Sequence, residues 1–245
     1  MLNTKEQKAF EEKFRATFIQ TSAYEMKLAE LADERKVENA LSFIQNKIEA
    51  PNFRVVASIF AKRLGFVAAG CLYAFSVCQK RVDVQHLSLQ AECEDDGLWL
   101  PQVYYIKQAI TQVDVANRNE ERKEIVTELF SKGFEPIWDA LNQYTGISKR
   151  VLWENIAVYI LWLYDQLKED SSVNQHQLET DFTYLFYEAT GDQFGQYEVN
   201  PLKCYARRES RQTCCLSYQL AGKKKYCKSC PILCRAKFKE ASIYG

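Results

Sequence analysis

Apolar positions in the first part of the chain repeat with a helical period. This spacing predicts one or two amphipathic helices over residues 5–20 and 22–49, which Pro51 interrupts. Residues 55–78 are apolar on nearly every side, a pattern typical of a helix buried in a protein core. The first third of the chain is therefore expected to be helical.

The helical period returns in the second half of the chain. Residues 120–144 form one such stretch, in which Gly133 and Pro136 predict a break or a kink. Gly146 is expected to end it. Ser148 is a good N-cap for an apolar helix that runs to about residue 168. An aromatic-rich helix is expected over residues 176–190.

Between these helical regions the pattern changes to alternation. Residues 84–90 alternate apolar and polar side chains, as in a half-buried strand, and residues 98–110 predict a second strand. The intervening residues 94–97, Glu-Asp-Asp-Gly, are typical of a turn. We therefore expect an α+β fold that is mostly helical, with a small antiparallel β-sheet around residues 82–110 and a cysteine-rich C-terminal segment.

Charge is distributed unevenly along the 245 residues, although acidic and basic residues are equal in number. Residues 201–245 hold eleven Lys and Arg against two Glu, a net charge of +9, so residues 1–200 carry the compensating −9. The composition also shifts to Cys, Lys and Arg after Pro201. These shifts predict an α+β domain over residues 1–200 and a separate C-terminal segment over residues 201–245.

The cysteine content is read together with the expected location of the protein. The N-terminal residues are polar, unlike a signal peptide, and the longest apolar run, residues 66–78, is too short to span a bilayer. We therefore expect a cytoplasmic protein. Disulfides are rare in the reducing cytosol, so the nine cysteines indicate metal binding where they cluster.

Four cysteines of the C-terminal segment have the spacing of metal ligands. Cys214 and Cys215 are adjacent, and Cys227 and Cys230 follow after eleven residues as a C-x2-C pair. Four thiolates suit zinc or an iron–sulfur cluster, and spacing alone does not choose between them. An adjacent pair is unusual for structural zinc and fits a two-iron cluster more readily, as do the basic surroundings, because such a cluster is an anion.

The remaining five cysteines are expected to lie outside the metal site. Cys204 and Cys234 flank the motif and could replace one of its members, but a spare thiol is the simpler interpretation. Cys71 and Cys78 share one face of the apolar helix and are interpreted as core residues. Cys93 lies beside the predicted turn and is given no role.

The cysteine motif resembles that of the FhuF-like family of ferric-siderophore reductases, whose C-terminal C-C-x10-C-x2-C motif binds one [2Fe–2S] cluster. The gap here is one residue longer, and the extra residue falls in residues 221–225. Residues 211–213 and 216–218, on either side of the adjacent pair, are also similar to the family. So, more weakly, are residues 57–63 and 152–157.

The resemblance implies an oxidoreductase that transfers one electron from a [2Fe–2S] cluster to siderophore-bound Fe(III), which releases Fe(II) in the cytosol. The implied cluster ligands are Cys214, Cys215, Cys227 and Cys230. The implied partners are a ferric siderophore and a reduced ferredoxin-like or flavin-type electron donor, with at most peripheral contact with a membrane transporter. No nucleic acid is expected.

Two charged residues within the apolar helix are candidates for substrate binding. Lys62 and Arg63 could contact an anionic ferric chelate, although a solvated helix edge or a structural ion pair is the simpler explanation. Trp153 and Asn155 have a similar status, because an asparagine in a buried stripe can simply satisfy a backbone group.

A second function is left open by the residues alone. The charge of +9 over residues 201–245 would also suit a zinc-stabilised binding module that docks nucleic acid or an acidic partner. Against this alternative, the segment has no interleaved aromatic residues that would form a base-stacking platform. A ligase related to siderophore synthetases is disfavoured because the chain has no Gly-rich phosphate loop.

Overall fold

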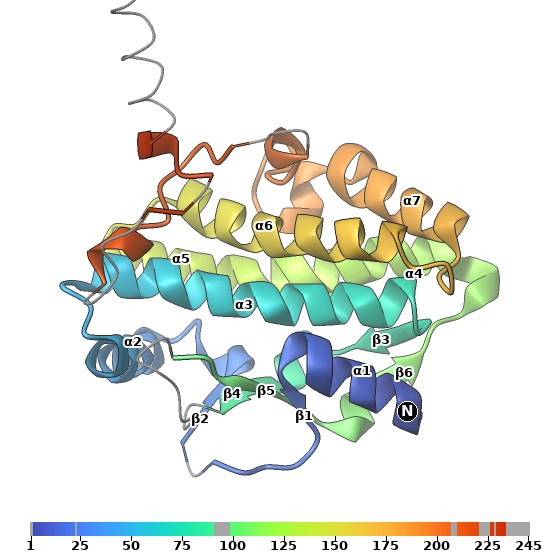
Figure 1. Cartoon of the computed structure of the whole chain (residues 1–245), viewed down its shortest axis with the longest axis horizontal. Coiled ribbons are helices and arrows are strands. Elements are labelled where there is room, and N and C mark those ends of the chain that lie inside the picture. Colours follow the sequence, from blue (N-terminus) through green and yellow to red (C-terminus); the bar gives the residue numbers. More distant parts are fainter. Residues whose placement is uncertain are drawn as a thin grey trace, which may run out of the picture.

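Two long helices form the centre of the molecule. The structure is a computed structural model that describes residues 2–22, 24–90, 99–206, 210–220, 226–227 and 229–233. Helix α3 (Phe53–Ser76) and helix α6 (Lys149–Lys168) lie side by side (Figure 1). Most residues of α3 are buried, which confirms the predicted core helix.

A glycine on α3 lets the two helices approach closely. A Cβ atom at Gly65 would lie 2.4 Å from Cδ2 of Tyr159, closer than real contacts come, so the glycine makes room for the tyrosine ring. Further along, Ser76 Oγ lies 3.4 Å from the hydroxyl of Tyr164. Because these contacts advance in the same direction along both sequences, α3 and α6 run parallel, and their N-terminal halves meet at one end of the molecule.

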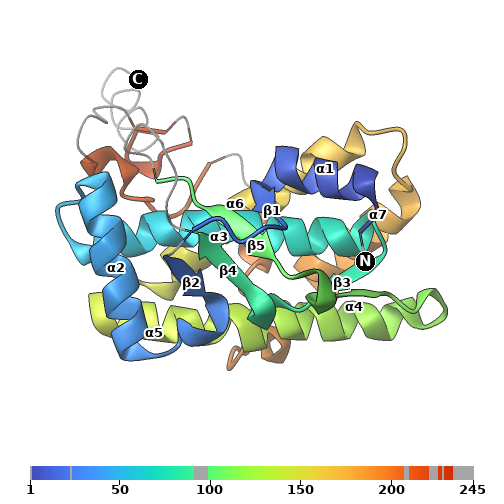
Figure 2. The same cartoon turned by 90° about the horizontal axis from the view of Figure 1, so that it is seen from below.

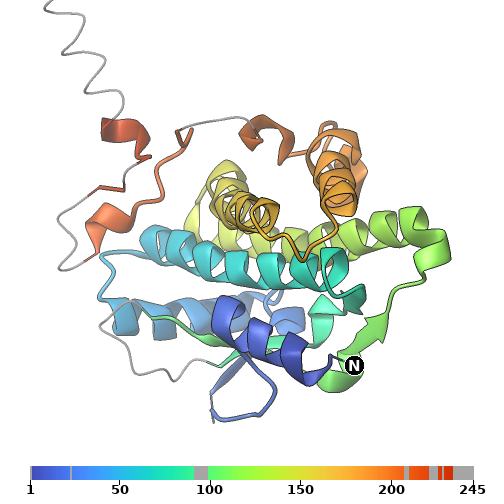
Figure 3. The ribbon, with the colours of Figure 1, turned by 45° about the vertical axis from the view of Figure 1, so that its right-hand side comes forward.

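Shorter helices surround this central pair. They are α1 (Thr4–Phe14), α2 (Glu34–Ile48), α4 (Arg118–Thr127), α5 (Glu135–Thr145) and α7 (Gln175–Thr183). Figure 3 shows α1 and α2, in blue, on one side of α3, and α6 and α7, in yellow and orange, on the other. The mostly helical α+β fold that the sequence predicts is confirmed.

The predicted break between α4 and α5 is confirmed, and it takes the form of a π-helix. This π-helix, Glu128–Phe134, contains Gly133, where an added Cβ would meet Cγ1 of Val84 at 2.7 Å. Pro136 stands in the first turn of α5, where its missing N–H leaves no hydrogen bond unmade. A second π-helix, Tyr184–Glu188, follows α7 within the helical stretch predicted over residues 176–190.

The connection from α5 to α6 also follows the prediction. Gly146 ends α5 in the left-handed conformation, with φ of 67°, which glycine adopts without strain. The hydroxyl of Ser148 then caps α6 by accepting the backbone N–H of Arg150. The start of α6 is therefore fixed by local chemistry.

The strands form two small sheets, seen from below in Figure 2. Four strands make the larger sheet, in the order β1 (Ala16–Thr17), β5 (Gln102–Tyr105), β4 (Leu87–Gln90) and β2 (Glu25–Lys27). Strands β4 and β5 pair in antiparallel fashion, with Leu89 opposite Val103, whereas β1 is parallel to β5. The smaller sheet pairs β3 (Lys80–Val82) with β6 (Ile110–Gln112).

Two predicted helices in the first third extend too far. The helix predicted over residues 5–20 ends at Phe14, because Arg15 adopts the left-handed conformation with φ of 54°, and β1 follows. The helix predicted over residues 22–49 begins only at Glu34, since residues 25–27 pair with β4 as strand β2. Strand pairing with distant residues overrides the local helical period in both cases.

The predicted strands are present but shorter. The first three residues of the strand predicted over 84–90 form a 3-10 turn, Val84–His86. The strand predicted over 98–110 is divided into β5 and β6 by a second 3-10 turn, Lys107–Ala109. The turn predicted at residues 94–97 lies outside the described residues.

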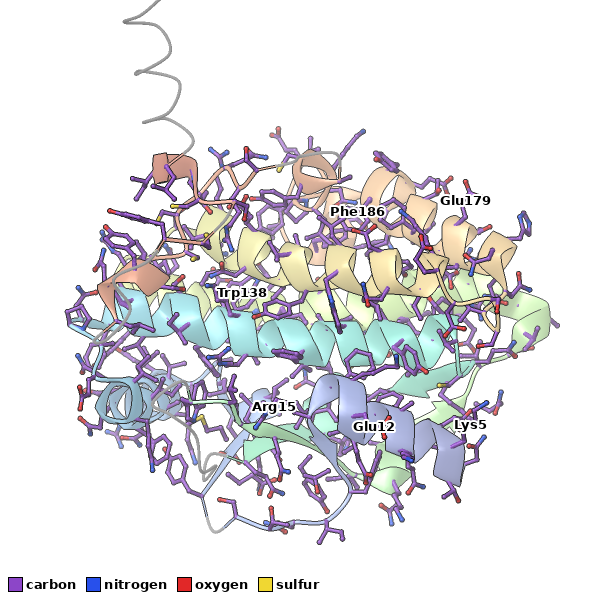
Figure 4. The ribbon with its side chains drawn as sticks, viewed as in Figure 1. Lys5, Glu12, Arg15, Trp138, Glu179 and Phe186 are labelled. Atoms are coloured by element: carbon purple, nitrogen blue, oxygen red, sulfur yellow. The ribbon has the colours of Figure 1, made fainter. Side chains whose placement is uncertain are left out.

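Large side chains fill the space between the helices. Trp138 and Phe186 are fully buried, and Figure 4 shows them inward of Lys5 and Glu179, which lie near the edge of the molecule. Helix α3 is long and apolar enough to cross a membrane, but 83% of its most apolar stretch is buried inside the protein. Leu202, Tyr205 and Leu220 belong to the same core, and the domain boundary expected at residue 200 stays a prediction.

Candidate metal centre

The cysteine-rich segment lies against the N-terminal halves of α3 and α6. Figure 1 shows its described part, in red, beside the beginning of α3. Contacts with Ser58 and Lys62 on α3 and with Glu154 and Asn155 on α6 hold it there. Because the two helices run parallel, Ser58 on α3 and Asn155 on α6 lie side by side although they are far apart in the sequence. The two N-terminal halves therefore form one continuous surface, the helix platform, beneath the cysteine segment.

A buried carboxylate on α6 anchors the backbone just before the adjacent cysteines. Glu154, only 3% exposed, accepts the backbone N–H of Gln212 at 2.6 Å and of Thr213 at 2.8 Å. It also accepts the Thr213 hydroxyl and lies 3.6 Å from Nη2 of Arg211. A carboxylate can accept several hydrogen bonds at once, and charge-assisted bonds are about twice as strong as neutral ones. These partners explain why a charged residue stands in the apolar interior of α6.

A neighbouring asparagine joins the two helices to the segment. Asn155 Nδ2 donates to the Ser58 carbonyl at 2.9 Å and to its hydroxyl at 3.0 Å. Its Oδ1 accepts from Nη2 of Arg211 at 2.5 Å, and Ser58 Oγ donates to the Cys215 carbonyl at 2.8 Å. Asn155 does satisfy a backbone group, as expected, and it is also part of a hydrogen-bond network that fixes the backbone of Cys215.

The second cysteine pair is tied to the first through the backbone. The N–H of Cys230 donates to the Cys227 carbonyl at 3.0 Å, which forms the tight turn expected of a C-x2-C pair. Between these cysteines, the carbonyl of Ser229 accepts the backbone N–H of Arg211 at 3.1 Å. Arg211 therefore contacts both arms of the motif and the helix platform beneath them.

The four thiols lie close enough to influence one another. Burial raises the pKa of Cys214, and the neighbouring Cys215 and Cys230 add to the increase. Burial likewise raises the pKa of Cys227, again with contributions from Cys215 and Cys230. All four are free thiols, of which Cys215 and Cys230 are buried and Cys227 is exposed. The motif therefore gathers at one site with one edge open to solvent.

Cys215 differs from the other thiols because a cation acts on it. Burial alone would raise its pKa, but the Lys62 ammonium and a hydrogen bond with Ser217 outweigh burial and lower the pKa to about 6. Ser217 Oγ lies 3.2 Å from Cys215 Sγ and accepts from Lys62 Nζ at 2.5 Å. The cation and the hydroxyl therefore favour the thiolate form of Cys215, the form in which cysteine binds metals.

The donor set fits a [2Fe–2S] cluster. Four thiolates are the ligands that this cluster takes, and the cations Lys62 and Arg211 offset their negative charge. Within the described ranges, no three His, Cys, Asp or Glu side chains converge at the spacing of a single-ion site.

The residues predicted to bind substrate have partners of their own. Lys62 bonds to Ser217, and Arg63 Nε donates to the Trp99 carbonyl at 2.7 Å. A role for either residue in substrate binding stays a prediction. Trp153 is 2% exposed and donates to the hydroxyl of Tyr197 at 2.9 Å, so its contacts lie in the core.

The other cysteines differ in their surroundings. Cys71 is buried in the main core, which confirms its interpretation, whereas Cys78 is only partly buried and lies just beyond the end of α3. Burial raises the pKa of both to about 12. Cys204 is exposed, and its carbonyl accepts from Gln212 Nε2 at 2.9 Å. Cys93 and Cys234 lie outside the described residues.

Glu154, Arg211 and Ser217 were missed as site residues. The only signal for Glu154 was its charge in an otherwise apolar stretch. Its partners belong to residues 211–213, and nothing in the sequence indicates that these residues lie beside it. Arg211 and Ser217 fall in the segments that resemble the family, but nothing in the sequence alone indicated what they contact.

Replacement of Glu154 by glutamine is expected to loosen the cysteine segment. The amide can accept one of the two backbone N–H groups, but its own NH2 then faces the other donor, which leaves buried groups unsatisfied at about 1–3 kcal/mol each. We expect Glu154→Gln to lower the free energy of unfolding in urea by that order and to reduce the metal retained per chain.

The matched control is Glu179→Gln, the same change at an exposed position of α7 (Figure 4). It should change the free energy of unfolding by no more than about 0.5 kcal/mol. The metal content per chain should equal that of the unmodified protein within experimental error. Equal behaviour of the two variants would show that the carboxylate of Glu154 does not anchor the segment.

Comparison with known families agrees with this site. Residues 89–213, just over half of the chain, match the family described as a ferric iron reductase FhuF-like transporter. Residues 211–231 match the FhuF 2Fe-2S C-terminal domain, and this range contains all four cysteines of the motif. No curated protein matches the chain. The chain belongs to the FhuF-like ferric iron reductase family, and its cofactor is a [2Fe–2S] cluster.

Proposed function

We propose that this oxidoreductase is a cytoplasmic ferric-siderophore reductase whose cluster is held by Cys214, Cys215, Cys227 and Cys230. The observation that carries the proposal is the gathering of these four thiols at one site with an edge open to solvent. When bound, the cluster supplies one electron to Fe(III) in the chelate. The released Fe(II) binds the hard oxygen ligands of a siderophore much more weakly.

The tasks left to the polypeptide are to hold the chelate near the cysteines and to admit an electron donor. A cavity of about 390 Å³ between α6 and the cysteine segment offers a place for the chelate. Arg211 and Ser229, which link the two arms of the motif, line one side of it. Val158 and Trp162 line the other side and are 39% and 40% exposed, so they present apolar surface to the cavity.

The charge of the segment supports the proposed electron donor. With a net charge of +9, residues 201–245 would attract an acidic one-electron carrier, such as a reduced ferredoxin-like or flavin-type protein. The exposed Cys227 would leave the edge of the site within reach of such a carrier. Any contact with a membrane transporter would be peripheral.

The alternative of a zinc-stabilised binding module is less well supported. It rested on the basic charge of residues 201–245 and on the ability of four thiolates to bind zinc. The match of residues 211–231 to a 2Fe-2S domain removes the second ground. The basic charge of residues 201–245 would then serve to attract the acidic donor protein and to offset the negative charge of the cluster.

Release of Fe(II) from a panel of hydroxamate, catecholate and citrate chelates tests the proposed function. Chemically reduced protein should release about one Fe(II) per chain from at least one class of chelate, because the cluster holds one exchangeable electron. Cys227→Ser and Cys230→Ser should lose both the visible colour and this release.

Cys204→Ser is the control, since this exposed thiol lies outside the proposed ligand set. It should keep the colour and the rate of release. Loss of the colour in Cys204→Ser would overturn the ligand assignment. The proposed function would be overturned if the reduced protein released Fe(II) from none of the chelates.

The proposed chelate site makes Trp162 a natural reporter. The other three tryptophans are at most 2% exposed, so a bound chelate should change the fluorescence of Trp162 alone. A redox-inert Ga(III) chelate should shift the emission of the unmodified protein, and Trp162→Phe should remove the shift. Trp162→Ala should raise KM for the ferric chelate about tenfold, a loss of ~1.4 kcal/mol of binding, with little change in kcat.

Ile19→Ala provides the comparison, because Ile19 is also a large apolar residue and is 71% exposed. It does not line this cavity. It should leave KM unchanged. An unchanged KM in Trp162→Ala would instead exclude this cavity as the chelate site without affecting the assignment of the cluster.

A further inference from the structure

A chain of hydrogen bonds leads from Lys62 to a thiol of the motif. Lys62 Nζ lies 2.5 Å from Ser217 Oγ, and the same oxygen lies 3.2 Å from Cys215 Sγ. A lysine ammonium can only donate, so Ser217 accepts from Lys62 and has its own proton available for the sulfur. The contacts of Lys62 thus orient the serine hydroxyl toward Cys215.

The positive charge of Lys62 lies beside the cysteine motif, because its Nζ is within hydrogen-bond distance of a hydroxyl that itself contacts Cys215 Sγ. Among the described residues, no carboxylate forms an ion pair with Lys62. Its charge is therefore directed at the thiols rather than cancelled by a neighbour.

We propose that Lys62 and Ser217 set the reduction potential of the [2Fe–2S] centre. This rests on the assignment of Cys215 as a ligand in the proposed function. Uptake of one electron from the donor protein changes the formal charge of the four-thiolate centre from about −2 to −3. A nearby cation and a hydrogen bond to a ligand sulfur stabilise the more negative state. Lys62 and Ser217 are thus positioning residues that act on the electron through Cys215.

The consequence for function is a balance between two transfers. A higher potential makes the electron easier to accept from the donor, but it leaves less driving force for reducing Fe(III) in the chelate. Lys62 and Ser217 would therefore help to decide which chelates the protein can reduce. This role differs from direct contact between Lys62 and the substrate, which leaves the potential in the absence of chelate unaffected.

Arg63 offers a matched comparison on the same helix. It carries the same charge one residue further along, but it donates to the Trp99 carbonyl and to Tyr159. Neither of these two contacts joins Arg63 to a thiol of the motif, whereas Lys62 is joined to Cys215 through Ser217. Loss of this charge should therefore affect the centre much less than loss of the charge on Lys62.

Redox titration of the iron-loaded full-length protein, followed by visible absorbance without any chelate, tests the proposal. Lys62→Met should lower the equilibrium constant for one-electron reduction about tenfold, which is ~59 mV in midpoint potential. Ser217→Ala should lower it by a smaller factor, and Lys62→Arg should keep most of the original value. Arg63→Met should give a much smaller shift than Lys62→Met.

An unchanged potential in Lys62→Met, or an equal shift in Arg63→Met, would overturn the proposal. So would an unchanged potential accompanied by a raised KM for the ferric chelate, because Lys62 would then be a substrate contact. If Lys62→Met does not retain iron, the midpoint potential of Ser217→Ala is the test, and an unchanged potential in that variant would overturn the proposal. Absence of any cluster in the unmodified protein would contradict the proposed function instead.

Discussion

The buried carboxylate of Glu154 is the interaction on which the site depends. It receives two backbone N–H groups directly before Cys214 and Cys215, so it fixes the path of the chain that leads into the adjacent cysteines of the motif. A carboxylate buried without such partners would be strongly unfavourable, and the segment without the carboxylate would lose its attachment to α6. The close parallel packing of α3 and α6, which Gly65 permits, brings the other anchors to the same place.

Charge is the second requirement of a four-thiolate site. Burial raises the pKa values of Cys214 and Cys227, and repulsion from the neighbouring thiolates adds to the increase. Lys62 and Arg211 supply positive charge from two directions, one on the helix platform and one within the segment. The same two side chains also bind structural partners, so the groups that hold the segment in place are those that make it suitable for an anionic iron–sulfur centre.

Sequence patterns predicted the features that depend on local chemistry. The cap at Ser148 and the end of α5 at Gly146 each involve neighbouring residues, and each was identified without a structure. Features that depend on distant partners were missed. Strand β1 forms only because β5 pairs with it, and Glu154 is explained only by its contacts with residues 211–213, which are distant in the sequence. Neither leaves a periodic signal in the sequence.

The cluster and its ligands are tested most directly by electron paramagnetic resonance combined with iron and sulfide analysis of the anaerobically purified protein. We expect about two iron and two sulfide per chain and, after reduction by one electron, a signal of a single unpaired spin on an all-thiolate [2Fe–2S] centre. Replacement of Cys214 by serine should alter or abolish that signal. One zinc per chain with no signal, or an unaltered signal in the Cys214→Ser variant, would contradict the assignment of this motif as the redox centre.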